Sequence, residues 1–323
     1  MRHRFPPDYY INGILNGDRL TLSRAITLVE SQRSDDQLLA QQVLEGVLPN
    51  TGNSIRVGIT GVPGVGKSTF IEAFGRYLTG QGHRLAVLAV DPTSQRSGGS
   101  LLGDKTRMET LSMDPNAYIR PSPAGDSLGG VSHRTRETML LCEAAGYDVV
   151  LVETVGVGQS ETVVHGMVDF FMLLMLAGAG DELQGMKRGI MELADALCIT
   201  KADGDNRAAA DRARVEYQNA LHLFPPTGTG WFPPVLTGSA LTGEGVDTVW
   251  QTIRDQQQLT TANGYRNQRR QEQQLTWFRA LLRQRLEGMF YEQPGIRERL
   301  AHIEEQVRTG TLLPGPAIDQ LLH

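Results

Sequence analysis

One short segment constrains the fold of this chain more than any other. Residues 61–68 spell Gly-Val-Pro-Gly-Val-Gly-Lys-Ser and fit the phosphate-binding pattern G-x-x-x-x-G-K-[ST]. An apolar run at 55–60 precedes it and is typical of a buried strand, and the helical pattern that follows is amphipathic. Glycines in such a loop let successive N–H groups point into one concavity, where they and the helix N-terminus can cradle a polyphosphate. The chain therefore begins its main fold with a strand, a phosphate loop and a helix.

Two side chains of this phosphate loop have different expected roles. We expect Lys67 to reach the β- and γ-phosphate oxygens and the Ser68 hydroxyl to bind Mg²⁺. A glycine-rich turn that matches by chance is the alternative, and the strand before and helix after the loop disfavour it. The predicted phosphate-binding residues are Gly61, Val62, Pro63, Gly64, Val65, Gly66, Lys67, Ser68 and Thr69.

Composition limits the class of protein and its partners. The 323 residues, 40% of them hydrophobic and 21% charged, suit a soluble chain with one main domain and smaller flanks. The formal net charge of -5 gives no basic field, which disfavours nucleic acid as a partner. Cys142 and Cys198 lie far apart in apolar segments without metal-ligand spacing, so we expect buried thiols. The N-terminus lacks the apolar stretch of a signal peptide, and the apolar run at 170–180 is flanked by acidic residues, which predicts a cytoplasmic protein without membrane contact.

The hydrophobic pattern changes twice along the chain. Residues 8–48 carry helical periodicity. From 54 onward short apolar runs alternate with helical segments, which favours an α/β fold with a doubly wound, mostly parallel sheet and helices on both faces. The predicted strands are 55–60, 85–90, 148–153, 170–176, 195–200 and 234–237.

No strand is expected beyond residue 260. A long polar helix at 264–290 carries a stripe of Leu275, Phe278, Leu282 and Leu286, and two shorter helices follow. The stripe packs either against a second subunit or back on the chain's own core. We predict a helical N-terminal extension at 1–53, a P-loop domain at 54–260 and a helical C-terminal arm at 261–323.

In a doubly wound sheet the ligand lies beyond the carboxyl ends of the strands. Glu153 ends the strand at 148–153, and a carboxylate there can hold Mg²⁺ or one of its waters. Gly156 can present its N–H to a γ-phosphate, so residues 155–161 are expected to shift when that phosphate leaves. Most P-loop enzymes use aspartate at this strand end, so Glu153 indicates a variant group.

A second strand end favours guanine. Thr200-Lys201-Ala202-Asp203, here named the base loop, is close to the pattern [NT]-K-x-D. The Asp203 carboxylate can accept hydrogen bonds from N1–H and the exocyclic amine of guanine, and adenine offers neither there. The stem of Lys201 can lie against the base, and Ser239, Ala240 and Leu241 resemble a supporting base loop.

Two further polar stretches follow strands. Asp91 and Asp104 lie in a glycine-containing segment that a γ-phosphate and Mg²⁺ could order, and for Asp104 a helix N-cap is the alternative. Residues 178–187 are either a third mobile loop or a plain connection. We assign catalysis to Lys67, Asp91, Asp104 and Glu153, and Mg²⁺ binding to Ser68, Asp91, Asp104 and Glu153.

Five motifs together resemble the MeaB/ArgK group of P-loop GTPases, which includes the methylmalonic aciduria type A proteins. They are GVPGVGKST at 61–69, DPTS at 91–94, SGGSLLGDKTRM at 97–108, ETVGVGQSE at 153–161 and TKAD at 200–203. The resemblance spans nearly the whole chain. Thr200 departs from the asparagine of many GTPases, which predicts weaker anchoring of the base loop without loss of the guanine contact.

The resemblance implies a GTPase chaperone for an adenosylcobalamin-dependent methylmalonyl-CoA mutase. Such a protein gates cofactor loading, protects or reactivates the mutase, and forms a homodimer through its C-terminal arm. Its ligands are Mg²⁺ and GTP or GDP, no tightly bound cobalamin is expected on this chain, and residues 178–187 resemble the family's third switch. Because the sequence assigns no glutamine or arginine finger, we expect hydrolysis to be slow alone and faster with the partner.

Three other functions remain open at this point. A metallochaperone GTPase of the hydrogenase or urease maturation type shares the core, but the seven histidines are scattered. A transport-associated kinase or ATPase is disfavoured by Asp203. A regulatory adaptor, in which hydrolysis is incidental, is the third.

Overall fold

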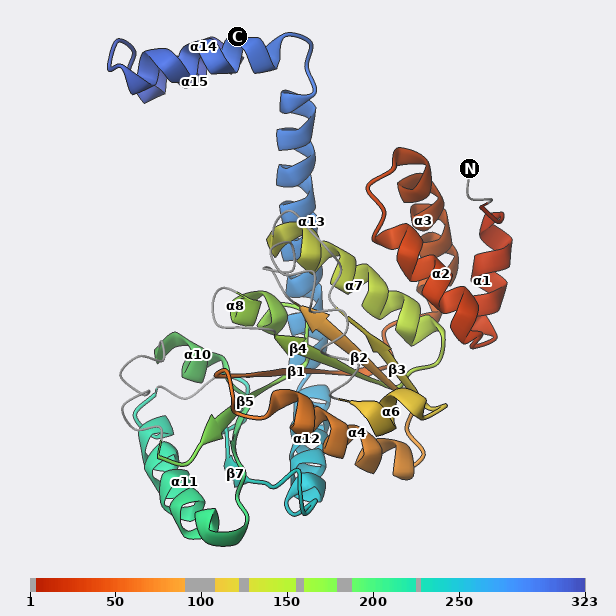
Figure 1. Cartoon of the computed structure of the whole chain (residues 1–323), viewed down its shortest axis with the longest axis vertical. Coiled ribbons are helices and arrows are strands. Elements are labelled where there is room, and N and C mark those ends of the chain that lie inside the picture. The colour runs from red at the N-terminus through yellow and green to blue at the C-terminus, as the bar shows by residue number, and fades with distance from the viewer. Residues whose placement is uncertain are drawn as a thin grey trace. The chain divides into compact units, whose positions relative to one another are not determined.

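The computed structural model describes residues 4–90, 108–121, 128–154, 160–178, 188–224 and 228–322. These form two compact units, residues 1–271 and 272–323, which are treated separately below. Figure 1 labels the helices and strands along the chain.

The first unit is built on a sheet of seven parallel strands (Figure 1). Its spatial order is β3-β2-β4-β1-β5-β6-β7, so the chain reverses its winding direction beside β1. The strands are β1 (Ile55–Gly61), β2 (Leu85–Val90), β3 (Ala117–Arg120), β4 (Val149–Thr154), β5 (Phe170–Leu176), β6 (Ala196–Thr200) and β7 (Val235–Thr237). All six strands expected from the sequence are present to within one residue at each end, and the predicted doubly wound α/β fold is confirmed.

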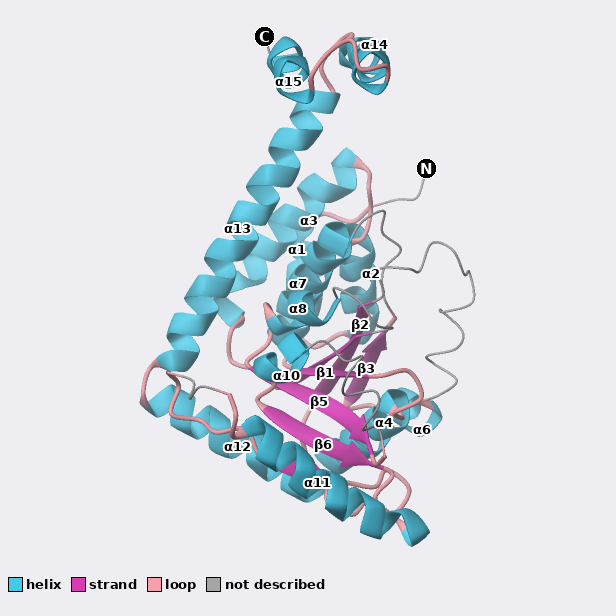
Figure 2. Cartoon of the chain, turned by 90° about the vertical axis from the view of Figure 1, so that its left-hand side faces the viewer, coloured by secondary structure: helices cyan, strands magenta, loops and turns pink. Residues whose placement is uncertain are grey.

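Helices cover both faces of the sheet, as Figure 2 shows. On one face α4 (Lys67–Gly80), α6 (Glu109–Met113) and α12 (Val246–Ala262) share a core with β1, in which Phe70, Phe74 and Trp250 are buried. The helices on the other face are α7 (Leu128–Ala144), α8 (Ser160–His165), α10 (Arg188–Leu193) and α11 (Arg207–Leu221). Because both faces are covered, the central strands are almost entirely apolar.

The N-terminal residues form the expected helical segment. It consists of α1 (Pro7–Leu15), α2 (Arg19–Val29) and α3 (Ser34–Val47), followed by a short 3₁₀ turn η1 (Leu48–Asn50). Asp18 begins α2 by accepting a hydrogen bond from the Leu20 N–H, at 3.0 Å. The buried faces of these helices share one core with α7, so the segment packs on the sheet's outer helical layer.

Strand β3 is absent from our sequence prediction. It has only four residues, and polar Asp114 and Asn116 precede it, so its pattern is too short to be distinguished from a loop. Its position depends on distant contacts instead. The register places Leu85 of β2 beside Ala117, and Arg120 forms an ion pair with Glu30, which caps the C-terminus of α2.

Both cysteines are buried free thiols, as expected from their apolar surroundings. Burial raises the pKa of Cys198 to about 12, so the thiol stays protonated. None of the described helices is long and apolar enough to span a membrane.

The second unit contains most of α13 (Tyr265–Tyr291), together with α14 (Ile296–Arg308) and α15 (Pro314–Leu322). Ile303 of α14 and Ala317 of α15 are buried. The apolar stripe of α13 is solvent-exposed: Leu275, Phe278, Leu282 and Leu286 are 54%, 61%, 46% and 57% exposed. The predicted bounds of the N-terminal extension, the P-loop domain and the arm remain predictions.

A buried network of charges lies at the amino ends of the central strands. Arg56 at the start of β1 pairs with Glu143 of α7, with 2.7 Å between Nε and Oε1. Glu143 also accepts a hydrogen bond from the Ser54 hydroxyl and one from the Gly52 N–H. Burial raises the pKa of Glu143, but the hydrogen bond and charge of Arg56 outweigh it and hold the pKa below 4.5, the ordinary value.

The first turns of α13 join the same region within the first unit. The Arg270 guanidinium donates from Nε to Asp169 Oδ1 at 2.7 Å and from Nη2 to Oδ2 at 2.6 Å. Arg270 also donates to the Ser54 carbonyl oxygen at 2.8 Å. Asp169 directly precedes β5, so the first turns of α13 are fastened to the amino end of a central strand.

We expect Glu143→Ala to lower the free energy of unfolding by about 3–5 kcal/mol, because it leaves the Arg56 guanidinium buried without its carboxylate. The pKa of Glu143 is lower in the folded than in the unfolded protein. The stabilisation that its carboxylate provides is therefore present above the unfolded pKa near 4.5 and is lost as the pH falls through the folded pKa. Denaturant titrations at pH 7 and below pH about 4 measure both effects.

Asp255→Ala is the matched control, because Asp255 is exposed on α12 and accepts one hydrogen bond from Gln251. We expect it to change stability by less than about 0.5 kcal/mol. Equal losses in both variants would contradict a special role for the buried pair.

Candidate functional site

The predicted phosphate loop connects β1 to α4 at the carboxyl edge of the sheet. Figure 2 shows the strand arrows running in one direction, so the carboxyl ends of neighbouring strands meet at that edge. Gly66 caps α4 with a φ of 93°, a left-handed conformation that strongly favours glycine. Val65 is fully buried under the loop, and its N–H donates to the Val62 carbonyl oxygen at 3.2 Å. The loop therefore surrounds the N-terminus of a 14-residue helix, a favourable position for an anion.

Lys67 is folded back over this loop. Its Nζ donates to the Gly61 carbonyl oxygen at 2.7 Å and lies 3.4 Å from the Val62 carbonyl oxygen. Burial lowers the pKa of Lys67, and the nearby charges of Glu153 and Glu161 oppose that effect. A cation held at the mouth of the loop by neutral carbonyls can exchange these contacts for phosphate oxygens.

Glu153 lies beside the phosphate loop, as its strand position predicts. β4 pairs with β1 so that Glu153 is level with Ile59, and its side chain is buried. Ser68 Oγ donates to Glu153 Oε1 at 3.3 Å. A hydroxyl and a carboxylate oxygen at this separation fit Mg²⁺, which prefers oxygen ligands.

The base loop is joined directly to the phosphate loop. Thr200 Oγ1 lies 2.8 Å from the Val65 carbonyl oxygen and 3.1 Å from the Met175 carbonyl oxygen. Lys201 Nζ donates to the Gly64 carbonyl oxygen at 3.0 Å. Thr200 thus fastens the base loop to the phosphate loop, and weaker anchoring than by asparagine stays a prediction.

Lys201 has an unusual backbone conformation. Its φ of 56° makes it the one residue other than glycine with positive φ among those that the structure describes. The Asn206 side-chain amide donates to the Lys201 carbonyl oxygen at 2.7 Å and holds this conformation. Strained backbone of this kind is often retained where it positions a functional group, and here it turns the lysine stem toward the phosphate loop.

Asp203 and the supporting loop meet at the same edge. The Ser239 hydroxyl donates to Asp203 Oδ2, and the Ala202 N–H donates to the Gly238 carbonyl oxygen at 3.2 Å. Ser239 is fully buried, whereas Leu241 is 83% exposed. Because each carboxylate oxygen can accept more than one hydrogen bond, Asp203 retains capacity for a ligand.

Several predicted site residues lie outside the described residues. These are Asp91, Asp104 and Gly156, with the loop at 179–187. Within the described ranges, no group of three or more His, Cys, Asp or Glu side chains is arranged to hold a metal ion. The arrangement of the expected Mg²⁺ ligands is therefore described only for Ser68 and Glu153.

Two supporting interactions were not anticipated from the sequence. Asn206 fixes the base loop, and its position three residues after Asp203 was the available signal. Thr154 Oγ1 donates to Thr60 Oγ1 at 2.8 Å and joins the ends of β4 and β1. The second pair could not be found in advance, because it depends on which strands are neighbours.

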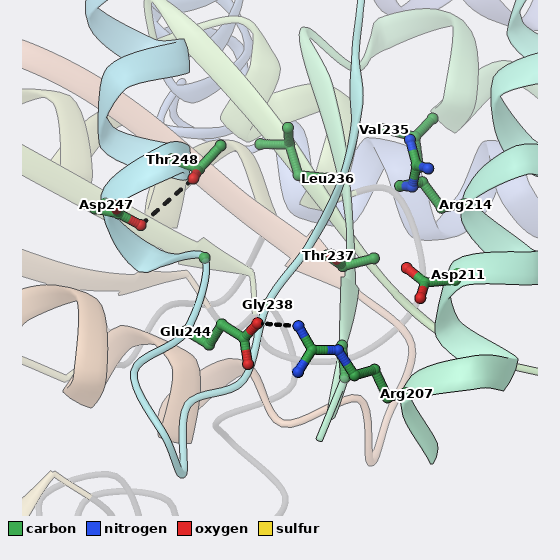
Figure 3. Close-up of a pocket in the computed structure, with 12 residues that line it drawn as sticks. Arg207, Asp211, Arg214, Val235, Leu236, Thr237, Gly238, Glu244, Asp247 and Thr248 are labelled. Atoms are coloured by element: carbon green, nitrogen blue, oxygen red, sulfur yellow. Dashed lines mark hydrogen bonds and ion pairs between the residues drawn. The ribbon is translucent and has the colours of Figure 1, made fainter. Parts of the chain in front are cut away.

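A separate cavity of about 490 Å³ lies behind the base loop, along β7 (Figure 3). Its lining includes Gly238 and Glu244 but neither the phosphate loop nor Asp203. It adjoins the candidate site through Ala202 of the base loop, which also lines it.

Comparisons with known proteins agree with this geometry. Residues 22–294 match the family described as methylmalonyl-CoA mutase-associated GTPase MeaB. The mouse protein named methylmalonic aciduria type A homolog, mitochondrial, is 50% identical over 325 residues, covering 98% of this chain and 78% of its own. GTPase ArgK of Escherichia coli is 47% identical over 311 residues, covering 96% of this chain and 94% of its own.

Among solved structures, the crystal structure of a LAO/AO transport system kinase aligns with a TM-score of 0.78 and 41% identity. The alignment covers 98% of this chain and 96% of that chain. The similarity therefore includes the helices on either side of the sheet domain.

We expect Thr200→Val to destabilise the protein by about 1–3 kcal/mol. The substitution removes the hydroxyl that lies within hydrogen-bond distance of the Val65 and Met175 carbonyl oxygens. Denaturant titration measures the loss, and amide hydrogen exchange at Val65 and Ser68 locates it. Thr200→Ser keeps the hydroxyl and is the matched control. Equal stability of the valine and serine variants would show that this bond does not hold the two loops together.

Proposed function

Because the chain belongs to the MeaB family of methylmalonyl-CoA mutase-associated GTPases, we propose that it binds GTP at the phosphate and base loops and hydrolyses it to GDP and phosphate. The direct bonding of these two loops carries the proposal. Thr200 and Lys201 each contact a phosphate-loop carbonyl, at 2.8 and 3.0 Å. A nucleotide whose base is held by the base loop would therefore keep its phosphates at the phosphate loop.

On the phosphate side, the proposed roles follow from charge and position. Lys67 binds the β- and γ-phosphate oxygens once it leaves the Gly61 carbonyl oxygen, and loop N–H groups bind the remaining oxygens. Ser68 and Glu153 would hold Mg²⁺, with Asp91 and Asp104 as further proposed ligands. When bound, Mg²⁺ would neutralise part of the negative charge of the phosphates.

On the base side, we assign guanine recognition to Asp203. The Ser239 hydroxyl fixes one carboxylate oxygen, which orients the group before any ligand arrives. Both oxygens can then accept from the N1–H and amine of guanine, while adenine offers no donor at either place. The stem of Lys201, with Ser239, Ala240 and Leu241, would complete the base site.

The family description points to the partner. The matched family is described as mutase-associated, and the mouse relative is named for methylmalonic aciduria. We propose a cytoplasmic chaperone that uses GTP to gate cofactor loading into methylmalonyl-CoA mutase and to protect or reactivate it. The exposed stripe of Leu275, Phe278, Leu282 and Leu286 supports the proposed homodimer, because apolar side chains at helical spacing gain most from a second copy.

We expect Asp203→Asn to weaken binding of mant-GDP by at least about 2 kcal/mol, roughly thirtyfold, because asparagine offers one acceptor where guanine presents two donors. The same variant should gain affinity for xanthosine diphosphate, since its amide can donate to the 2-carbonyl of xanthine. Fluorescence titration measures both ligands.

Asp205→Asn is the matched control, because Asp205 is an exposed carboxylate in the following turn. It should leave nucleotide selectivity unchanged. If wild-type protein prefers mant-ATP to mant-GTP, the guanine assignment is wrong and a kinase function is favoured.

The chaperone proposal is tested with purified adenosylcobalamin-dependent methylmalonyl-CoA mutase. We expect the two proteins to co-elute and the mutase to raise the rate of GTP hydrolysis at least about tenfold, because the described part of the site supplies only Lys67 as a cation to the phosphates. Lys67→Ala should abolish hydrolysis in both conditions. Absence of both complex and stimulation would refute the partner assignment but leave the guanine site untouched.

A further inference from the structure

The cavity along β7 has the form of an open strand position. Among the strands that the structure describes, β7 lies at the edge of the sheet and pairs with β6 alone. α11 covers one face of the sheet at this edge and α12 covers the other, so the groove between them continues the plane of the sheet. We name it the edge groove; its lining residues include Val235, Leu236, Thr237, Asp211, Glu244 and Asp247 (Figure 3).

The ladder between β6 and β7 shows which backbone groups face this groove. The Leu197 N–H donates to the Pro234 carbonyl oxygen, and the Gly238 N–H donates to the Ile199 carbonyl oxygen. In a parallel pair alternate residues bond to the same neighbour, so Leu236 faces β6 with both of its groups. Val235 and Thr237 therefore direct their N–H and C=O groups away from β6, toward the groove.

Two of these four groups are already covered. The Val235 N–H donates to Gln218 Oε1 at 3.0 Å, so a side-chain amide occupies the place of a strand carbonyl. The backbone of Gly245, with φ of 80°, lies so close that a Cβ there would come within 2.2 Å of the Thr237 carbonyl oxygen. No described residue forms a hydrogen bond with the Val235 carbonyl oxygen or the Thr237 N–H.

These two remaining groups match a single residue of an added parallel strand. In such a pair, the residue level with Leu236 donates its N–H to the Val235 carbonyl oxygen and accepts from the Thr237 N–H. Leu197 of β6 bonds to β7 in the same way one residue earlier. A parallel segment in this register meets both groups with one residue, and Gln218 and Gly245 limit the ladder to that residue.

The walls of the edge groove carry different charges. On α11, Asp211 is flanked by Arg207 and Arg214, which are four residues before it and three after it on the same helix. The α12 wall presents Glu244 and Asp247 and no lining cation. Arg207 already pairs with Glu244, whereas Asp247 accepts a hydrogen bond from the Thr248 hydroxyl and forms no ion pair with a described residue.

The side chain of the incoming residue would point to the acidic wall. Leu236 packs against the core that β1 shares with α4 and α12, whereas Val235 belongs to the core with α11. Side chains level with one another on neighbouring strands point to the same face of a sheet. A residue beside Leu236 is thus directed to the face that α12 covers, and Asp247, which lines the groove at the start of α12, favours lysine or arginine there.

We propose that the edge groove binds an extended segment of a partner protein as an eighth, parallel strand, with a lysine or arginine level with Leu236. Main-chain hydrogen bonds to Val235 and Thr237 supply the general attraction, and Asp247 selects the basic side chain. This inference does not rest on the nucleotide site: Asp203 and the phosphate loop do not line the groove, although Ala202 of the base loop does.

The test uses full-length protein and a fluorescein-labelled heptapeptide of alternating valine and threonine with a central lysine. Its matched control carries glutamate at the centre. We expect the lysine peptide to bind at least about tenfold more tightly than the glutamate peptide and to slow amide hydrogen exchange at Thr237. Equal affinities, or unchanged exchange at Thr237, would overturn the proposal.

Two charge reversals on α12 separate recognition from general charge effects. Asp247→Lys should remove the preference for the lysine peptide, while Asp255→Lys, on the same helix outside the groove, should preserve it. Circular dichroism and mant-GDP binding establish that both variants are folded. If protection of the Thr237 amide increases with protein concentration in the absence of peptide, the groove binds a second copy and the proposal is overturned. Binding of the lysine peptide that survives Asp247→Lys would also overturn it.

Discussion

The structure depends on a parallel sheet that is covered on both faces. Because helices bury β1, β4 and β5 on each side, the strands must be apolar and their backbone groups must be paired within the ladder. Polar chemistry is therefore confined to places where strands begin, where they end, or where the sheet has an edge. The buried ion pairs lie where strands begin, the candidate nucleotide site where they end, and the proposed edge groove at the edge of the sheet.

The two ends of the central strands have different roles. At the amino ends, pairs such as Arg56 with Glu143 are buried and mutually compensated, which suits a fixed structure. At the carboxyl ends, Lys67 and Asp203 are held by groups that a ligand can replace or share. The same residue types thus stabilise one edge of the sheet and leave the other available for binding.

The candidate site was predictable to the extent that its motifs are local. The phosphate loop and the base loop are each continuous segments at strand ends, so their residue types and spacing identified them. The two carbonyl partners of Thr200, on Val65 and Met175, could not be predicted, because both residues are distant in sequence. β3 was missed for the same reason: its pairing with β2 and the ion pair of Arg120 with Glu30 decide its place.

The sequence alone determined the alternation of strands and helices, the motif of the phosphate loop and the proposed acceptor for guanine, because each depends on residues that are neighbours along the chain. Only the tertiary structure decided which strand ends meet, how the base loop is fastened to the phosphate loop, and that β7 faces an open groove with Asp247 on one wall. Strand order and edge exposure arise from packing between distant segments, and no local pattern of residues records them.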